Sequence, residues 1–288
     1  MTATTPLRAA PGVPVRRRRS AGTTRPVRTL LLHGLGSSRA IWDRFVSVAP
    51  PELELWDAEL PWASGGNGGW SQHGDPADWA TEALRAVDGG VDLVVAHSFA
   101  ANMMLELLCR TGAAEPWSRP DAAAPRAAVL VSPFYRPAAD DFDWAAITFY
   151  LNDFHRILEE GIRVSAGAGL PTEVRAAMAD RVRERIGPYG WMRFFDAYLR
   201  TPFLPVADLT VPLLVVSGDR DFAAQPSDGR ALAAASPAGR YALVPDCGHF
   251  AMAEHPDRFA ALVADFTRPL VASDVAPEPI LDTHLERT

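Results

Sequence analysis

Short runs of apolar residues recur along the chain, and within each run the apolar positions are continuous rather than alternating with polar ones. Runs of this kind are typical of strands that are covered on both faces, as in a parallel sheet. The pattern predicts six such strands, at residues 28–34, 53–60, 91–98, 126–134, 212–219 and 241–249.

Stretches that favour helix lie between these strands. Four are predicted, at residues 75–87, 99–110, 228–237 and 255–270, and the first of them starts with an aspartate suited to a helix N-cap. Strands that alternate with helices are typical of a doubly wound α/β domain. The predicted fold class is therefore α/β, with a doubly wound and mostly parallel sheet.

The alternation stops between the strand at 126–134 and the strand at 212–219. Three helical stretches follow one another there with no strand between them, at 141–163, 171–187 and 191–200. We interpret this part of the chain as a helical cap that is inserted into the sheet domain.

The expected domain organisation follows from this insertion. The α/β core takes residues 13–135 and 205–270, and the helical cap takes residues 136–204. Residues 1–12 and 272–288 are expected to be flexible, as chain ends often are. The second of these segments is also rich in proline and charge, which is typical of disorder.

A run of four arginines at residues 16–19 has two interpretations. It could be a patch for an anionic partner. We favour a solvated edge strand, the first strand of a hairpin that leads into the next strand at Arg28.

Composition excludes several classes of function. The chain has 288 residues and a formal net charge of −7, which argues against general nucleic-acid binding. No apolar run approaches the roughly 18 residues that a membrane span needs, and no secretory signal is evident. The two cysteines, Cys109 and Cys247, suggest neither a disulfide framework nor a metal site. We therefore expect a cytoplasmic protein with no membrane partner and no metal or other cofactor, while the oligomeric state is left open.

Candidate chemistry begins at Ser98, where a predicted strand meets a predicted helix. The sequence there is Ala96-His97-Ser98-Phe99-Ala100, with small residues two positions before and after the serine. A nucleophile at such a corner projects above the carboxyl edge of the sheet, with the N-terminus of the following helix beside it. The usual pattern is G-x-S-x-G, and alanine replaces both glycines here. The alternative is that Ser98 only caps the helix.

A His-Gly-x-Gly turn at residues 33–36 follows another predicted strand. Such a turn can direct backbone N–H groups at a developing oxyanion. The N–H groups of Leu35 and Phe99 are the predicted pair of donors, and a plain glycine turn is the alternative. His33 is expected to be structural.

The acid and the base are predicted near the C-terminal end of the chain. Asp219 and Asp221 follow the strand at 212–219, and we choose Asp221 as the residue that orients an imidazole, with Asp219 fixing the turn. His249, in a loop after the last strand, is the predicted base. An acid in the loop at 140–143 stays open as an alternative. His97 is expected to point away from Ser98.

The order Ser98, Asp221, His249, with each residue at a strand end, resembles the α/β-hydrolase superfamily over residues 13–270. The resemblance implies a serine hydrolase that forms an acyl-enzyme and needs no cofactor. It implies a small-molecule ester or thioester substrate, free or on a carrier protein, as in bacterial specialised, polyketide-type metabolism. The aromatic cap favours a medium-to-large apolar acyl group. The segment after the strand at 53–60 departs from the pattern that many members show there.

Aromatic residues of the cap are the candidates for an acyl pocket. They are Phe149, Tyr150, Phe154, Trp191 and Phe195. The alternative, which we expect for more than half of the cap aromatics, is that they pack the cap onto the core. Trp62 and Trp70 are candidates for the rim of the entrance.

Other functions are compatible with the same residues. C–C bond hydrolysis and lactone hydrolysis use the same triad, and a lyase or cyclase could use the same pocket without adding water. A binding protein with an inactive triad is a different class, and the presence of all three residues argues against it.

Overall fold

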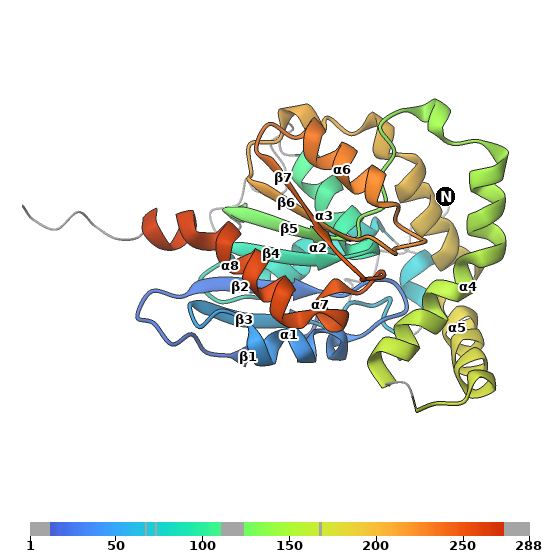
Figure 1. The fold of residues 1–288 in the computed structure, drawn as a ribbon, viewed down its shortest axis with the longest axis horizontal. Helices are drawn as coiled ribbons and strands as arrows, with labels where there is room; N and C mark the ends of the chain where they lie inside the picture. Colours follow the sequence, from blue (N-terminus) through green and yellow to red (C-terminus); the bar gives the residue numbers. More distant parts are fainter. Residues whose placement is uncertain (1–11, 67, 73, 111–123, 167–168, 274–288) are drawn as a thin grey trace, which may run out of the picture.

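A computed structural model describes residues 12–66, 68–72, 74–110, 124–166 and 169–273 of the chain. Its centre is a seven-stranded sheet with the order β1-β3-β2-β4-β5-β6-β7, in which only the β1–β3 pair is antiparallel (Figure 1). The strands are β1 (Val15–Arg19), β2 (Val27–Leu32), β3 (Leu53–Ala58), β4 (Leu93–His97), β5 (Ala127–Val131), β6 (Leu213–Gly218) and β7 (Gly239–Val244). The predicted fold class is confirmed.

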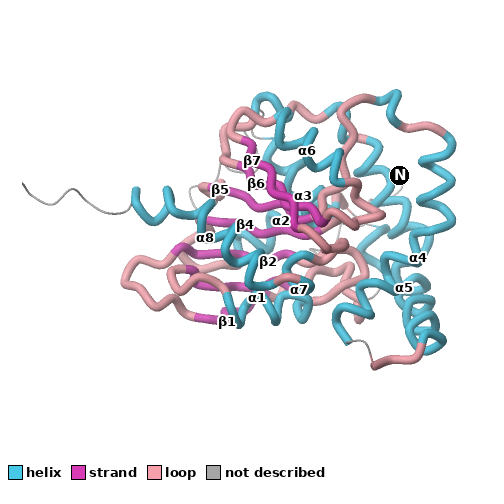
Figure 2. The backbone as a smooth tube through the Cα atoms, in the orientation of Figure 1, coloured by secondary structure: helices cyan, strands magenta, loops and turns pink. Residues whose placement is uncertain are grey.

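Helices cover both faces of this sheet (Figure 2). Alternate residues of a strand face opposite sides, so Leu30 and Leu32 belong to one core and Leu31 to the other. The first core is closed by α2 (Pro76–Arg85), α3 (Phe99–Cys109) and α6 (Pro226–Ala235). The second is closed by α1 (Asp43–Val48), α7 (Ala251–Glu254) and α8 (Pro256–Ser273). Strands buried on both faces explain the continuous apolar runs in the sequence.

The pairing of β1 differs from the prediction. The strand lies at the edge of the sheet as expected, but it pairs with β3 and does not form a hairpin with β2. Asp57 on β3 is fully buried, and its carboxylate accepts hydrogen bonds from Arg16 Nε at 3.1 Å and Arg18 Nη1 at 2.6 Å. A buried carboxylate needs such partners, so the arginines hold β1 beside β3.

The segment between β5 and β6 is helical. It contains α4 (Trp144–Ala166) and α5 (Thr172–Leu199), and α5 bends where Gly187 adopts φ +64° before Pro188. Proline cannot continue a regular helix, which explains why the sequence predicts two helices here. Both helices lie at one end of the sheet, where α4 contacts α7 (Figure 1). The exact limits of the cap, residues 136–204, stay a prediction.

Two further expectations concern the ends of the chain and membranes. The segments predicted to be flexible, 1–12 and 272–288, lie almost wholly outside the described residues. Within the described residues, no helix is both long enough and apolar enough to cross a bilayer.

Candidate active site

Ser98 occupies the turn between β4 and α3. Its backbone has φ 56° and ψ −124°, a strained conformation for a residue with a side chain. The Ser98 N–H donates to the carbonyl oxygen of Val131 at 2.8 Å, which anchors the turn to the neighbouring strand. Ala96 and Ala100 are buried on either side, so larger side chains would have no space there.

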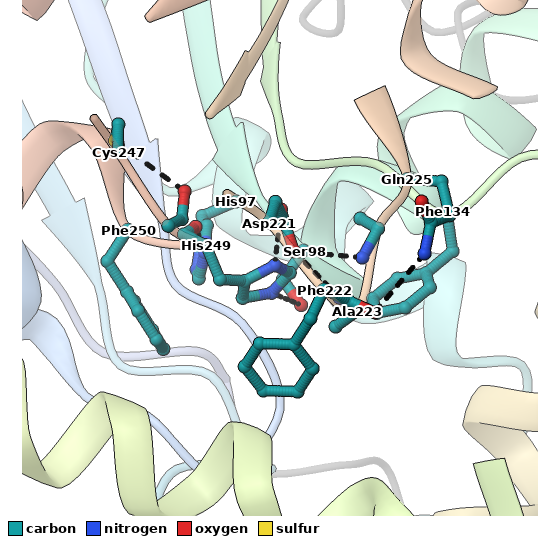
Figure 3. Close-up of polar contacts among 12 residues, drawn as sticks. His97, Ser98, Phe134, Asp221, Phe222, Ala223, Gln225, Cys247, His249 and Phe250 are labelled. Atoms are coloured by element: carbon teal, nitrogen blue, oxygen red, sulfur yellow. Dashed lines mark hydrogen bonds and ion pairs between the residues drawn. The ribbon is translucent and has the colours of Figure 1, made fainter. Parts of the chain in front are cut away.

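The structure brings Ser98 together with the predicted acid and base (Figure 3). His249 Nε2 lies 3.0 Å from Ser98 Oγ, and His249 Nδ1 lies 2.9 Å from Asp221 Oδ2. The second oxygen of Asp221 accepts the N–H groups of Ala223 and Ala224, each at 3.0 Å. The carboxylate is therefore fixed on both sides, and the imidazole has the arrangement that a general base requires.

The alternative acids lie elsewhere. Asp219 Oδ1 accepts the backbone N–H of Cys247 at 3.2 Å, which joins the end of β6 to the loop before His249. In the loop at 140–143, Asp141 binds the N–H of Ala138 and Asp143 binds the N–H of Ala146 at the start of α4. These carboxylates are exposed and stabilise local turns, whereas Asp221 contacts the imidazole.

The loop that carries His249 is held by a carboxylate that sequence reasoning missed. Glu254 on α7 accepts the N–H of Gly248 at 3.1 Å and the N–H of Phe250 at 3.0 Å, the residues on either side of His249. Arg163 on α4 lies close to the same carboxylate, with its Nη2 3.8 Å from Glu254 Oε2. Glu254 lies five residues after a loop histidine and just before the helix predicted at 255–270, and this position gave no indication of the contact.

The glycine turn at residues 33–36 lies directly against the serine. A Cβ at Gly34 would be 2.8 Å from Ser98 Cβ, so only glycine allows this approach. The Gly36 N–H donates to the carbonyl of Trp62, and Ser64 N–H donates to the carbonyl of Ser37, which ties the turn to the loop after β3. Within the described residues, the N–H groups of Leu35 and Phe99 have no hydrogen-bond acceptor, as an oxyanion site requires.

His33 is structural, as expected. Its Nδ1–H donates to the Gly34 carbonyl at 2.9 Å, and its Nε2 accepts the N–H of Leu60 at 3.1 Å. Burial lowers the pKa of His33 by penalising the imidazolium, which fits these two bonds of the neutral ring.

His97 lies closer to the site than expected. Its ring packs against the ring of His249, with centroids 4.9 Å apart, and it lines the cavity above Ser98. The His97 Nε2–H donates to the backbone carbonyl of His249 at 3.0 Å, while Nδ1 is buried without a hydrogen-bond partner among the described residues. Burial, followed by the proximity of His249, lowers the pKa of His97 well below its ordinary value.

A cavity of about 390 Å³ opens above Ser98 between the glycine turn and the helical insertion. Its apolar wall comes mainly from α4, with Ile157, Leu158 and Ile162, and from Phe250 beside the histidine. Its polar side contains Ser98, the serines of residues 37, 38 and 64, and two arginines of α5. The apolar residues of α4 recur at helical spacing in the sequence, and that periodicity could have identified this wall.

The cap aromatics do not line this cavity, which corrects the prediction for Phe149, Tyr150, Phe154, Trp191 and Phe195. Tyr150 and Phe195 are buried in the core, and the Tyr150 hydroxyl donates to the Ala223 carbonyl at 2.9 Å. Phe154 and Trp191 border a separate groove on the insertion. Tyr150, Phe154 and Phe195 belong to the first core, and Phe149 and Trp191 pack against it, which is the alternative that the sequence analysis kept for most of them.

Trp62 and Trp70 are also placed differently from the prediction. Both are buried against Phe99, with ring centroids 5.0 and 6.0 Å from its ring, so neither borders the entrance. The loop after β3 therefore packs against Phe99, the first residue of the helix that follows Ser98. Within the described part of the chain, no group of three His, Cys, Asp or Glu residues could hold a metal ion.

Comparisons with known proteins agree with this architecture. The model of the alpha/beta hydrolase family matches residues 29–262. No curated protein matches the chain. Among solved structures, a membrane phospholipase A described as a bacterial virulence factor has a TM-score of 0.60 at 16% identity, over 90% of this chain and 87% of that one.

Two further solved structures are similar. An N-acyl homoserine lactone degrading enzyme has a TM-score of 0.58 at 18% identity, over 88% of this chain and 97% of that one. The enol-lactonase from Burkholderia xenovorans has a TM-score of 0.56 at 17% identity, over 88% of this chain and 95% of that one. At these identities the likeness concerns the fold alone.

Proposed function

The chain belongs to the alpha/beta hydrolase family, and we propose that it is a serine hydrolase that cleaves an ester or thioester through an acyl-enzyme on Ser98. One observation carries this proposal. A serine in a strained strand-to-helix turn contacts an imidazole, which contacts a buried carboxylate, beneath a cavity of about 390 Å³. An ordinary serine on the surface has no base of this kind beside it, and a serine that only caps a helix does not need one.

The proposed reaction follows from these contacts. His249 Nε2 takes the proton of Ser98 Oγ as the oxygen attacks the acyl carbon. Asp221 holds the ring through Nδ1–H and stabilises the imidazolium that forms. The negative oxygen of the tetrahedral intermediate accepts the N–H groups of Leu35 and Phe99, and such a donor is worth about 3–4 kcal/mol in comparable sites. The imidazolium then protonates the leaving group, and water releases the acyl group by the same route.

The cavity favours an acyl group of medium size. Its volume lies at the lower end of the roughly 300–1,000 Å³ that is usual for small-molecule sites. The α4 wall is apolar, which suits an alkyl or aryl acyl chain. The substrate is proposed to be a small molecule, free or attached as a thioester to a carrier protein, as in polyketide-type metabolism.

Lactone hydrolysis is the second candidate. A lactone is a cyclic ester, so the same triad and the same oxyanion donors would open it without any further residue. The described cavity would admit a cyclic as well as an open ester. An N-acyl homoserine lactone degrading enzyme and an enol-lactonase share the fold.

Intact-mass labelling with a fluorophosphonate tests the nucleophile. We expect one adduct on the wild-type protein and none on the Ser98→Ala variant. Hydrolysis of acyl esters, acyl thioesters and lactones of increasing chain length then identifies the bond. A labelled serine without turnover of any of them would favour a C–C hydrolase, lyase or cyclase, and the absence of a label would favour a binding protein.

A further inference from the structure

The charge of the cavity above Ser98 differs from that of the whole chain. The chain has 35 acidic and 28 basic residues. The described residues that line this cavity include Arg181 and Arg185 but no aspartate or glutamate. An acidic protein therefore presents a cationic surface to its own candidate substrate.

The two arginines lie one turn apart on α5, so their side chains emerge on the same face of the helix. That face points at the glycine turn, since a Cβ at Gly36 would be 2.8 Å from Val182 Cγ1. Arg185 Nη1 donates to the carbonyl oxygen of Ser64 at 2.7 Å, and both residues line the cavity. Arg181 and Arg185 thus frame the polar side of the site.

Neither guanidinium is neutralised within the described part of the chain. No carboxylate there lies within ion-pair distance of Arg181 or Arg185, whereas Arg183, between them, pairs with Asp180 at 3.0 Å. A guanidinium offers several N–H donors in a planar fork that matches a carboxylate or a phosphate. Two guanidiniums without a carboxylate partner among the described residues, beside serine hydroxyls, are therefore suited to an anion.

We propose that the substrate carries an anionic group, a carboxylate or a phosphate, beside its apolar acyl chain, and that Arg181 and Arg185 bind this group. The inference rests on the proposed ester or thioester hydrolysis at Ser98. The apolar wall of α4 receives the chain, and the arginines of α5 receive the charge. The substrate is thus an amphiphilic anion rather than a neutral lipid ester.

Matched pairs of substrates test the proposal and identify the source of the charge. One pair is p-nitrophenyl hexanoate and mono-p-nitrophenyl adipate, which differ by a terminal carboxylate. The other is S-hexanoyl pantetheine and S-hexanoyl phosphopantetheine, which differ by a phosphate. We expect kcat/KM to favour the charged member of one pair by about tenfold or more, since a tenfold ratio corresponds to only about 1.4 kcal/mol, less than a charge-assisted hydrogen bond contributes.

Variants connect the preference to the two residues. In Arg181→Met/Arg185→Met the ratio of charged to neutral kcat/KM should fall about tenfold or more, because the cations that distinguish the pair are gone. Arg183→Met, on the same helix but paired with Asp180, is the matched control and should keep the wild-type ratio. Equal rates within each pair for the wild type, or an unchanged ratio in the double variant, would overturn the proposal.

A binding measurement separates this inference from the proposed function. Calorimetry on Ser98→Ala compares octanoate, octyl phosphate and octanol, which need no turnover. Tighter binding of an anion, lost when both arginines are also replaced, would support the anion site even if no ester or thioester were hydrolysed. Equal binding of all three ligands would overturn the anion site even if the neutral esters were hydrolysed.

Discussion

Ser98 shows how much a single backbone conformation depends on its neighbours. Its positive φ is unfavourable for a residue with a Cβ, and it persists because the turn is held from three sides. Val131 accepts its N–H, Ala96 and Ala100 leave space beside it, and Gly34 allows the glycine turn to approach its Cβ. The alanines that replace the usual glycines are thus small enough for the turn.

Replacing each of the two aspartates after β6 by asparagine is expected to reduce activity by very different amounts. Asp221→Asn keeps the shape of the side chain but removes the charge that orients and stabilises the imidazolium of His249, so kcat should fall by about 10⁴. Asp219→Asn retains an oxygen that can accept the Cys247 N–H, and its effect should stay within about a few-fold. Steady-state hydrolysis of one ester by both variants measures the difference. A larger loss in Asp219→Asn would contradict the assignment of the acid.

At the scale of elements, the sheet and the placement of Ser98, Asp221 and His249 could be predicted from the sequence, whereas the partner of β1 and the positions of the cap aromatics could not. Continuous apolar runs mark the parallel strands, and short-range patterns place Ser98, Asp221 and His249 at strand ends. The partner of β1 depends on the contact of its arginines with Asp57, about 40 residues away in sequence, and no local pattern encodes it. Likewise, aromatic residues of the cap are equally suited to a pocket and to a core, so only packing decides between them.

A further prediction concerns the position of a whole loop, the one between β7 and α7, and not a group that reacts with the substrate. Glu254 accepts the N–H groups on both sides of His249, so it positions the loop without contacting the cavity. Glu254→Gln offers one oxygen where two are used, so kcat should fall about tenfold while KM changes less than about twofold. Glu159→Gln, a change on α4 that does not alter this loop, is the control. A rise in KM with unchanged kcat would show that Glu254 acts on the substrate instead.

At the scale of the whole molecule, two buried histidines connect stability to pH. His33 and His97 are both buried, and burial is the largest cause of the lowered pKa of each ring. Both rings are therefore held neutral in the folded protein, while the same histidines in the unfolded chain take up protons near their ordinary pKa of 6.5. The unfolded state thus binds more protons below this pH.

The free energy of unfolding should therefore be insensitive to these two groups above pH 6.5 and should fall as the pH drops below it. Below pH 6.5, each ring adds about 1.4 kcal/mol per pH unit to the slope of the free energy of unfolding against pH. This holds as long as the pH stays above the pKa of that ring in the folded protein. Thermal unfolding between pH 8 and pH 5 measures the slope, and His97→Gln should reduce it by about one histidine's share. An unchanged slope in this variant would show that His97 takes up its proton in the folded state.

Strand β1, with its arginines at the edge of the sheet, also affects whether two copies of this protein associate through their sheets. An open sheet ends in unpaired backbone groups, and such an edge is a template on which a strand of a second molecule can add. On β1, Arg16 and Arg17 carry half-exposed charges along this edge strand, and the register shifts between Arg17 and Arg19. Charge and an irregular edge both oppose strand addition, so Arg16, which helps to neutralise Asp57, also protects the fold against aggregation.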